Sequence, residues 1–470
     1  MPYSRWALAA RRFPHVRVAQ PPPGGRVFAW GLVILGLGLL AIATAPLGIA
    51  GAQTAPATAP VESAPPNGQF GSANFCAPIP CDPGPRKLPP AAGGAMPNLT
   101  STQMGFFTQG QTTFEEVDTV SNRLGPRFNM NSCAGCHAYP AVGGSSPPTN
   151  PQAAITGQSI PSFITATGPV REVRFVKNPD GTPDGGVHDL FVNPGCGLSQ
   201  PDFAGALGAN NAIFRIPTPT FGAGLIEAIP DATIVANMKA SAGQKAGLGI
   251  SGRTNNSGND GTVTRFGWKA QNKSLVMFAG EAYNVEQGVT NEVFPNERDI
   301  CSTQSATPED FTGNGGAAQS DVTQFGLFMQ MLAPPTAQQP NPFTQHGQQV
   351  FSQAGCDMCH TPSLTTGPST IAALSNQKAN LYSDLLIHDM GSGLADNISQ
   401  GGASGNEFRT APLWGVGQRL FFLHDGRTSD LMEAIQQHAS SGSEANQVVG
   451  NFNNLNTFDK ETLLVFLRSL

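Results

Sequence analysis

Charged residues are scarce in this 470-residue chain. Only 12% of the residues are Asp, Glu, Lys or Arg, and the formal net charge is −6. The sequence contains no basic patch and no long acidic run, which are the features that mark nucleic-acid-binding segments and acidic tails. We therefore expect no nucleic-acid partner.

The ligands of a zinc finger are also missing. Residues 132–137 and 355–360 each contain the pattern Cys-x-x-Cys-His. A Cys-x-x-Cys pair alone is often a zinc half-site or a thiol redox pair. Zinc needs four ligands at each centre, however, and neither copy is accompanied by a second Cys-x-x-Cys or a His pair at finger spacing.

The same pattern is the attachment motif of c-type haem. Two thiols three positions apart each form a thioether with one vinyl group of the porphyrin, and the adjacent His supplies an imidazole to the iron. Two independent copies predict two covalently bound haem c groups. The attachment residues are Cys133, Cys136 and His137 in the first copy and Cys356, Cys359 and His360 in the second.

Glycine and proline are abundant, with 55 Gly and 40 Pro. Together they make up about a fifth of the chain, which predicts a loop-rich protein and not a compact helical bundle. The length allows two or three domains.

Residues 1–52 have the features of a targeting segment. An apolar run from Val27 to about Ile49 is followed by Ala50-Gly51-Ala52, a small-residue cleavage site. The run is also long enough to span a bilayer, so the segment is either a cleaved signal peptide or an uncleaved anchor. In both cases we expect a periplasmic protein, attached to the inner membrane only if the anchor is retained. The positive residues before the run are Arg5, Arg11, Arg12, Arg17 and Arg26.

Residues 53–95 are rich in Ala and Pro and predict a disordered linker. Four cysteines lie outside the haem motifs, and an oxidising compartment favours disulfides between them. Three pairings are possible. We favour Cys76–Cys81 with Cys196–Cys301, because the first two are close in sequence.

A Gly-x-x-x-Phe pattern precedes each haem motif, as Gly110/Phe114 and as Gly347/Phe351. A cytochrome c domain needs such a helix, with Gly where it crosses the C-terminal helix closely. Residues 458–470 have the apolar face expected of that second helix. The sequence thus predicts a mainly α protein of two cytochrome c-like domains, residues 96–301 and 319–470, joined by a polar linker at 302–318.

Residues 170–192 do not follow the helical pattern. Val170–Val176 alternates between apolar and polar residues, residues 178–181 (Asn-Pro-Asp-Gly) supply a turn, and an apolar run follows from Val187 to Val192. This pattern predicts a small β-hairpin inserted in the first domain.

The second axial ligand of each iron separates an electron carrier from a catalyst, because an open position lets peroxide or oxygen bind. After His137, the next His is His188 and the next Met is Met238. This gap favours an open or weakly ligated first haem. The second motif is followed by five candidate ligands, which are His388, Met390, His424, Met432 and His438.

Three residues are candidates for catalysis near the first haem. Glu281 and Glu286 lie on a predicted helix between Lys269 and about Asn291, where a carboxylate can shuttle the proton of a peroxide. The alternative is that both glutamates lie on a solvent-exposed helix face and have no catalytic role. Trp268 is one of only four tryptophans, and it is either a core residue or a bridge for electrons between the haems.

Several motifs resemble the bacterial di-haem oxidoreductase family, which is similar to the di-haem cytochrome c peroxidases and to the haem enzyme that matures methylamine dehydrogenase. The similarity covers about residues 100–470, and its motifs occur in the same order. They are residues 124–133 (Leu-Gly-Pro-Arg-Phe-Asn-Met-Asn-Ser-Cys), 168–172 (Gly-Pro-Val-Arg-Glu), 266–271 (Phe-Gly-Trp-Lys-Ala-Gln), 386–391 (Leu-Ile-His-Asp-Met-Gly), 409–415 (Arg-Thr-Ala-Pro-Leu-Trp-Gly) and 422–427 (Phe-Leu-His-Asp-Gly-Arg).

The resemblance implies roles for individual residues. In the peroxidases the far ligand of the C-terminal, electron-transferring haem lies 14 residues beyond the His of the His-Asp-Gly motif, which is His438 here, a His in place of their Met. Their N-terminal haem carries a Gln and a Glu above it, and Glu286 resembles that Glu. Many also hold calcium through carbonyls just before His-Asp-Gly, where this chain departs from the pattern with Arg419-Leu420-Phe421.

These observations predict an exported di-haem oxidoreductase of the peroxidase type. Its C-terminal haem would take electrons from a small donor protein such as a cytochrome or cupredoxin. Its N-terminal haem would act on a peroxide or a small organic substrate. The alternatives are a non-catalytic periplasmic electron-transfer cytochrome c and a haem oxygenase-like activity on an organic substrate.

Overall fold

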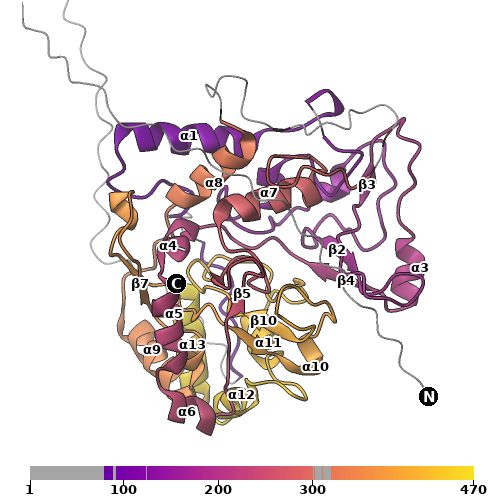
Figure 1. The fold of residues 1–470 in the computed structure, drawn as a ribbon. Coiled ribbons are helices and arrows are strands. Elements are labelled where there is room, and N and C mark those ends of the chain that lie inside the picture. The colour runs from indigo at the N-terminus through magenta and orange to yellow at the C-terminus, as the bar shows by residue number, and fades with distance from the viewer. Residues whose placement is uncertain (1–78, 88–90, 123, 300, 302–309, 311–318) are drawn as a thin grey trace, which may run out of the picture. The chain divides into compact units, whose positions relative to one another are not determined.

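Two pairs of crossed helices lie next to the two haem motifs in a computed structural model of the chain (Figure 1). The structure describes residues 79–87, 91–122, 124–299, 301, 310 and 319–470, all within one compact unit that spans residues 69–470. The predicted segment 1–52, most of the predicted linker 302–318 and Cys76 lie outside the described residues.

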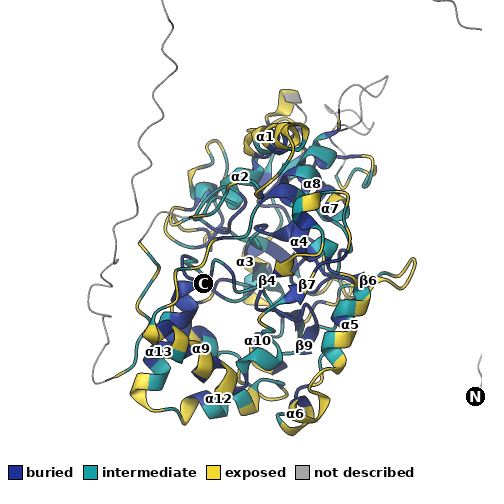
Figure 2. Ribbon diagram, turned by 90° about the vertical axis from the view of Figure 1, so that its left-hand side faces the viewer, coloured by how far each residue is buried: buried dark blue, intermediate teal, exposed yellow. Residues whose placement is uncertain are grey.

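The described part of the chain is mostly helical, with small two-stranded sheets. The helices are α1 (Ser101–Glu115), α2 (Cys133–Cys136), α3 (Phe203–Gly208), α4 (Ala223–Ala228), α5 (Asp231–Lys239), α6 (Ala242–Gly247), α7 (Leu275–Glu286), α8 (Asp321–Met331), α9 (Pro342–Ala354), α10 (Gly391–Leu394), α11 (Leu431–Gln436), α12 (Asn446–Asn453) and α13 (Thr457–Ser469). The strands are β1 (Arg127–Phe128), β2 (Glu172–Phe175), β3 (Phe191–Val192), β4 (Ala212–Arg215), β5 (Asn255–Asn256), β6 (Val263–Thr264), β7 (Leu364–Thr365), β8 (Lys378–Ala379), β9 (Ile387–Asp389) and β10 (Glu407–Arg409). Buried residues concentrate on inner elements such as β9, whereas α1 and α12 present exposed residues (Figure 2).

Helices α9 and α13 form the pair next to the second motif. Helix α9 is capped by Asn341, whose side chain accepts hydrogen bonds from backbone N–H groups of the first turn. A Cβ at Gly347 would overlap the carbonyl oxygen of Thr462, so only glycine allows the two backbones to come this close. Phe351 then packs edge-on against Phe466, with ring centroids 5.6 Å apart. The predicted packing of the terminal helix on the Phe343–Phe351 helix is confirmed.

Helices α1 and α8 form the corresponding pair next to the first motif. A Cβ at Gly110 would lie 2.5 Å from the carbonyl oxygen of Gln324 and 3.0 Å from the Cβ of Phe328. The Gly-x-x-x-Phe repeat therefore marks a close helix crossing in both halves. Helix α8 follows the predicted linker, so this pair includes residues from both sides of the predicted domain boundary.

The strand pairing differs from the predicted hairpin. Strand β2 pairs antiparallel with β4, in a register that places Glu172 opposite Arg215. Strand β3 pairs with β1. The turn at residues 178–182 is present, and backbone hydrogen bonds such as Gly185 N–H to the carbonyl oxygen of Phe175 connect its two arms, but the arms do not form a continuous two-stranded ladder. Alternation predicted the strand at 172–175 correctly, but it carries no information about which distant strand supplies the partner.

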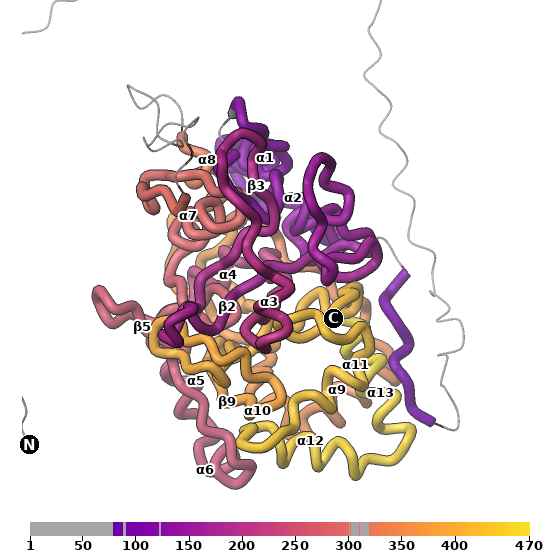
Figure 3. Tube along the Cα trace, turned by 90° about the vertical axis from the view of Figure 1, so that its right-hand side faces the viewer, coloured from indigo at the N-terminus to yellow at the C-terminus, as the bar shows by residue number. Residues whose placement is uncertain are grey.

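Residues 79–87, which the Ala/Pro-rich composition assigned to a disordered linker, are held against α13 (Figure 3). Arg468 donates from Nε to Asp82 at 2.8 Å, and both side chains are 5% exposed. The backbone N–H of Arg86 also donates to the carbonyl oxygen of Gly417, and that of Leu431 donates to Asp82, each at 2.8 Å. Composition missed these contacts because they join residues that are far apart in the sequence.

Cys196 and Cys301 form the predicted disulfide. Cys81 is also disulfide-bonded. Among the described residues, no helix has the length and apolar content to cross a membrane.

Candidate functional site

The second Cys-x-x-Cys-His motif lies at the end of α9. Gly355 ends the helix with a left-handed backbone (φ 94°), and a short 3-10 turn over Cys356–Met358 follows. This turn directs Cys356, Cys359 and His360 into one cavity, which we call the C-terminal cavity. Its wall is mainly apolar and includes Phe351, Leu394, Phe422, Val449, Phe452, Leu463 and Leu467.

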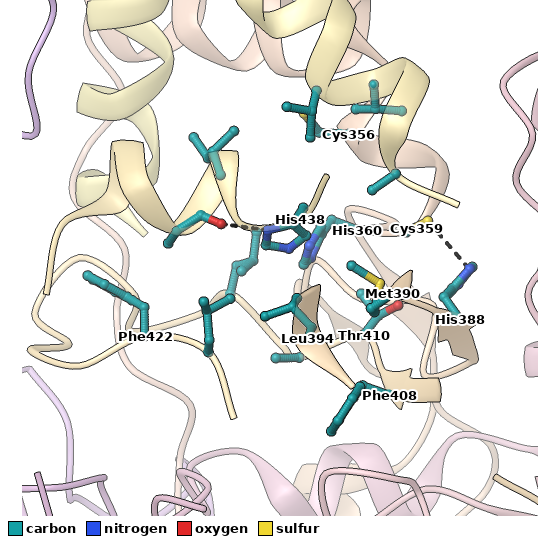
Figure 4. Close-up of a pocket in the computed structure, with 18 of the residues that line it drawn as sticks. Cys356, Cys359, His360, His388, Met390, Leu394, Phe408, Thr410, Phe422 and His438 are labelled. Carbon is teal, nitrogen blue, oxygen red and sulfur yellow. Dashed lines mark hydrogen bonds between the residues drawn. The ribbon is translucent and has the colours of Figure 1, made fainter. Parts of the chain in front are cut away.

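Two imidazoles face this cavity in the form that binds iron. Nδ1 of His360 lies 3.0 Å from the carbonyl oxygen of Tyr382, and Nδ1 of His438 lies 2.7 Å from that of Ala434. A carbonyl accepts only, so each Nδ1 carries the proton and each Nε2 keeps a free lone pair. Burial lowers the pKa of His360 to about 4 and also lowers the pKa of His438, so both rings stay neutral. Figure 4 shows the two rings in the centre of the cavity.

Of the other four candidate ligands, three are less suitable than His438. Both nitrogens of His388 are occupied, Nε2 by Asp384 at 3.0 Å and Nδ1 by Glu444 at 2.7 Å. The ring of His424 is stacked on Phe408 at 4.3 Å. Met390 lines the cavity, but Met432 is not among the lining residues.

The first motif opens into a second cavity, the N-terminal cavity, where α2 places Cys133, Cys136 and His137. Nδ1 of His137 lies 3.0 Å from the carbonyl oxygen of Gly144, which places the ring proton on Nδ1, and Thr218 makes a second backbone hydrogen bond to this ring. Burial lowers the pKa of His137 to about 4. Among the described residues no other histidine lines this cavity, although Met130 and Met329 do.

A carboxyl pair distinguishes the N-terminal cavity from the C-terminal one. The side chain of Glu286, at the end of α7, is hydrogen-bonded to Glu172 at the start of β2. Glu286 also accepts a hydrogen bond from Nδ2 of Asn129 at 2.9 Å. Arg174 donates from Nε to Glu172 at 2.6 Å. All of these side chains except Asn129 line the cavity.

The two carboxyl groups of the pair differ in protonation. Burial, together with the neighbouring Glu172 charge, raises the pKa of Glu286 well above its ordinary value. Burial alone would also raise the pKa of Glu172, but the charges of Arg174 and Arg215 and the hydrogen bonds from Glu286 and Arg174 together outweigh it, and the pKa falls to about 2. At neutral pH the shared proton therefore resides on Glu286, which donates to ionised Glu172.

Both cavities fit c-type haem. The four motif cysteines are free thiols, and each pair shares a cavity with an imidazole whose Nδ1 donates to a backbone carbonyl. A family model described as "Di-haem oxidoreductase, putative peroxidase" matches residues 209–470, more than half of the chain. The chain belongs to this di-haem oxidoreductase family. The matched range contains the second motif, and the first motif precedes it.

Two solved structures are similar to this di-haem oxidoreductase at low scores. A MauG-like protein associated with microbial copper homeostasis is 15% identical, with 54% of this chain and 90% of that one covered and a TM-score of 0.28. The hydrazine synthase of Kuenenia stuttgartiensis, pressurised with xenon, is 14% identical, with 82% and 93% covered and a TM-score of 0.34. No curated protein matches the chain. The family assignment therefore rests on the sequence match alone.

The structure brings the three predicted catalytic residues of this di-haem oxidoreductase together. Glu281, Glu286 and Trp268 all line the N-terminal cavity. Glu281 accepts a hydrogen bond from Asn272. Trp268 also lines the C-terminal cavity, and its indole N–H donates to the carbonyl oxygen of Ile216 at 2.9 Å.

Sequence reasoning missed the partners of Glu286. Glu172 lies in one of the family-like motifs and Arg174 in the alternating stretch 170–176, and neither position by itself indicates a role in proton transfer. The signal was the alternation of β2, because residues two apart on a strand point to the same face. Glu172 and Arg174 are such a pair.

Proposed function

We propose that this di-haem oxidoreductase is a c-type, peroxidase-like enzyme whose two haem sites have different tasks. The observation that supports this proposal is the difference between the two cavities. The C-terminal cavity offers two neutral imidazoles with free Nε2 atoms, as an electron-transferring haem requires. The N-terminal cavity offers one imidazole and a proton-holding carboxyl pair.

The residues that would hold the haems are those of the two motifs, with thioethers from the four cysteines and axial imidazoles from His137, His360 and His438. Haem iron supplies one-electron chemistry and a binding position for peroxide or oxygen. The protein's own contribution is proton control. Arg174 keeps Glu172 ionised, and ionised Glu172 keeps the proton on the carboxyl group of Glu286, which can deliver it to a substrate oxygen in the cavity.

Trp268 is the proposed connection between the two sites. Its indole lines both cavities and is fixed by the hydrogen bond to Ile216. An aromatic side chain in this place shortens the path that an electron must cross between them. The proposed direction is from a small cytochrome or cupredoxin to the C-terminal site and on to the N-terminal site.

The proposed location is the periplasm, because residues 1–52 have the pattern of an export segment, either cleaved or retained as an anchor. The proposed substrate is a peroxide or a small organic molecule. We propose no calcium site before the His-Asp-Gly motif. Arg419 occupies that segment with its guanidinium 5.7 Å from the ring centre of Trp268, and a fixed positive charge opposes a second cation.

One observation favours the alternative, a non-catalytic electron-transfer cytochrome. Met130 and Met329 line the N-terminal cavity, and a thioether sulfur is a known second ligand of haem iron. If either sulfur binds the iron in solution, no position is open for a substrate.

Optical and EPR spectra of the purified protein, with and without cyanide or carbon monoxide, separate the two functions. The peroxidase proposal expects one low-spin haem and one haem that binds an added ligand. It also expects hydrogen peroxide to be consumed when a reduced small cytochrome is present. Two low-spin haems that bind neither ligand in any redox state would contradict the catalytic function and support the carrier.

A further inference from the structure

Two arginines on the wall of the C-terminal cavity have no acidic partner. Arg409, at the end of β10, and Arg419 both line this cavity and the smaller space beside Trp268. Arg409 is 9% exposed, and its Nε donates to the carbonyl oxygen of Gly267 at 3.0 Å. Arg419 is partly open to the cavity, yet its Nε and Nη2 atoms are buried and have no hydrogen-bond partner.

The two guanidinium groups form a concentrated positive charge. Among the described residues neither has an ion-pair partner, whereas the buried Arg215, Lys269 and Arg468 each pair with an aspartate. Burial lowers the pKa of Arg409 and of Arg419 to about 10, and the charge of Arg419 contributes to the shift of Arg409. Both groups are thus close together and still charged at neutral pH.

Buried charges without partners are costly, by several kcal/mol per ion. The cavity that these two charges line is the proposed site of a haem c. Thioether formation uses the two vinyl groups of the porphyrin and leaves its two propionate carboxylates free. A guanidinium fork matches a carboxylate in geometry as well as charge. Two unpaired cations and two unpaired anions therefore balance within one cavity.

We propose that Arg409 and Arg419 bind the propionate carboxylates of the haem attached to Cys356 and Cys359. This inference rests on the proposed function, because it requires a haem in the C-terminal cavity. The ion pairs would keep both propionates ionised while the iron changes charge.

The test is the reduction potential of the low-spin haem as a function of pH in the holoprotein, for native protein and for Arg419→Gln and Arg409→Gln. A guanidinium near the iron disfavours the ferric form, which carries one more positive charge. Removal of one guanidinium should therefore lower the ratio of reduced to oxidised haem at a fixed solution potential by about tenfold. A propionate that loses its partner should also titrate, so the potential should fall with rising pH between about pH 5 and pH 8, where the native curve is flat.

Two control variants keep the result interpretable. Arg427→Gln removes a guanidinium from the same half of the chain that is already paired with Asp425 at 2.7 Å, and its curve should match the native one. Arg419→Lys keeps the charge but not the fork, and should shift the potential less than Arg419→Gln. If one Gln variant does not accumulate, the other Gln variant and Arg419→Lys still test the proposal.

Haem content separates this inference from the proposed function. Pyridine haemochrome assays should give two haems per chain in all variants, because thioethers retain the porphyrin after a propionate contact is lost. A native chain without haem on Cys356 and Cys359 would overturn the proposed function itself. A full haem content with Gln-variant curves that coincide with the native curve would overturn the propionate assignment alone.

A free carboxylate is the other ligand that could satisfy the pair. Succinate added to the native protein should leave the potential and the spectrum unchanged, because the propionates already occupy both guanidiniums. A saturable shift with succinate would show that the pair is open to external carboxylates and would overturn the assignment.

Discussion

Substitution of Gly347 by alanine tests the helix crossing that supports the second haem motif. An added Cβ would overlap the carbonyl oxygen of Thr462 and lie 2.8 Å from the Cβ of Phe466, where ordinary contact begins at 3.4 Å. Helices α9 and α13 would have to separate by at least about 0.6 Å at Phe466 and by more at Thr462, and such overpacking costs about 1–3 kcal/mol or more. Alanine recovers about 1 kcal/mol of helix propensity. The overlap with the Thr462 backbone places the cost at the upper end, about 3 kcal/mol, so we expect a net loss of about 2 kcal/mol in the free energy of unfolding.

The assay is urea unfolding of the haem-loaded protein, followed by far-UV circular dichroism. Gly105→Ala is the matched control, because Gly105 lies on α1 and a Cβ there meets nothing within 4 Å. The control should raise the free energy of unfolding by about 0.5–1 kcal/mol through helix propensity alone. Equal stabilisation by both substitutions would refute the claim that the crossing requires glycine.

Three further predictions concern the two cavities and the segment of residues 79–87. His438→Ala should convert the C-terminal haem from low-spin to high-spin, and an unchanged EPR spectrum would reject His438 as its ligand. Glu286→Gln should lower kcat for peroxide at least about 100-fold, because proton transfer by a positioned acid contributes that much. Unchanged spectra of the C-terminal haem would serve as the control for correct folding. A normal kcat would exclude Glu286 as the acid. Asp82→Asn should destabilise the protein by about 3 kcal/mol at neutral pH, because it leaves the charge of Arg468 buried and unpaired. Burial opposes the ionised form of Asp82, but the Arg468 charge and hydrogen bond outweigh it and lower its pKa. The difference in free energy of unfolding between the native protein and the variant should therefore be full above the ordinary carboxyl pKa, and it should disappear as the pH falls through the lowered pKa of Asp82. If urea unfolding shows a difference that does not change with pH, this ion pair is contradicted.

Local patterns predicted the features that depend on neighbouring residues. The Cys-x-x-Cys-His spacing places two thiols and an imidazole on one short turn, and no distant contact is needed to bring them together. The Gly-x-x-x-Phe repeat predicted a close helix crossing, because a helix fixes which residues share a face. The position of His438 relative to His424 came from the resemblance to the family, and the structure places its ring in the C-terminal cavity.

Other features could not be predicted in this way. Helix α8 packs on α1, although more than 200 residues separate Gly110 from Gln324 and the composition of the linker suggested a boundary between them. The pairing of β2 with β4 could not be predicted, because alternation does not select among several possible partner strands. The Asp82–Arg468 pair joins residues that are 386 positions apart in the sequence.

By itself, the sequence determined the positions of the two Cys-x-x-Cys-His motifs, where we propose that the haems attach, and that the surroundings of the two motifs differ in histidine content. Only the tertiary structure decided which side chains face each cavity. Glu172, Arg174 and Glu286 act together because β2 and the end of α7 meet at the N-terminal cavity, and the proton's place on Glu286 depends on burial and on the neighbouring charges. Only the tertiary structure shows that Arg409 and Arg419 have no acidic partner among the described residues, because ion pairing depends on the three-dimensional surroundings of each side chain. Covalent attachment is a local property of the chain, whereas charge balance in a buried cavity depends on every element that lines it.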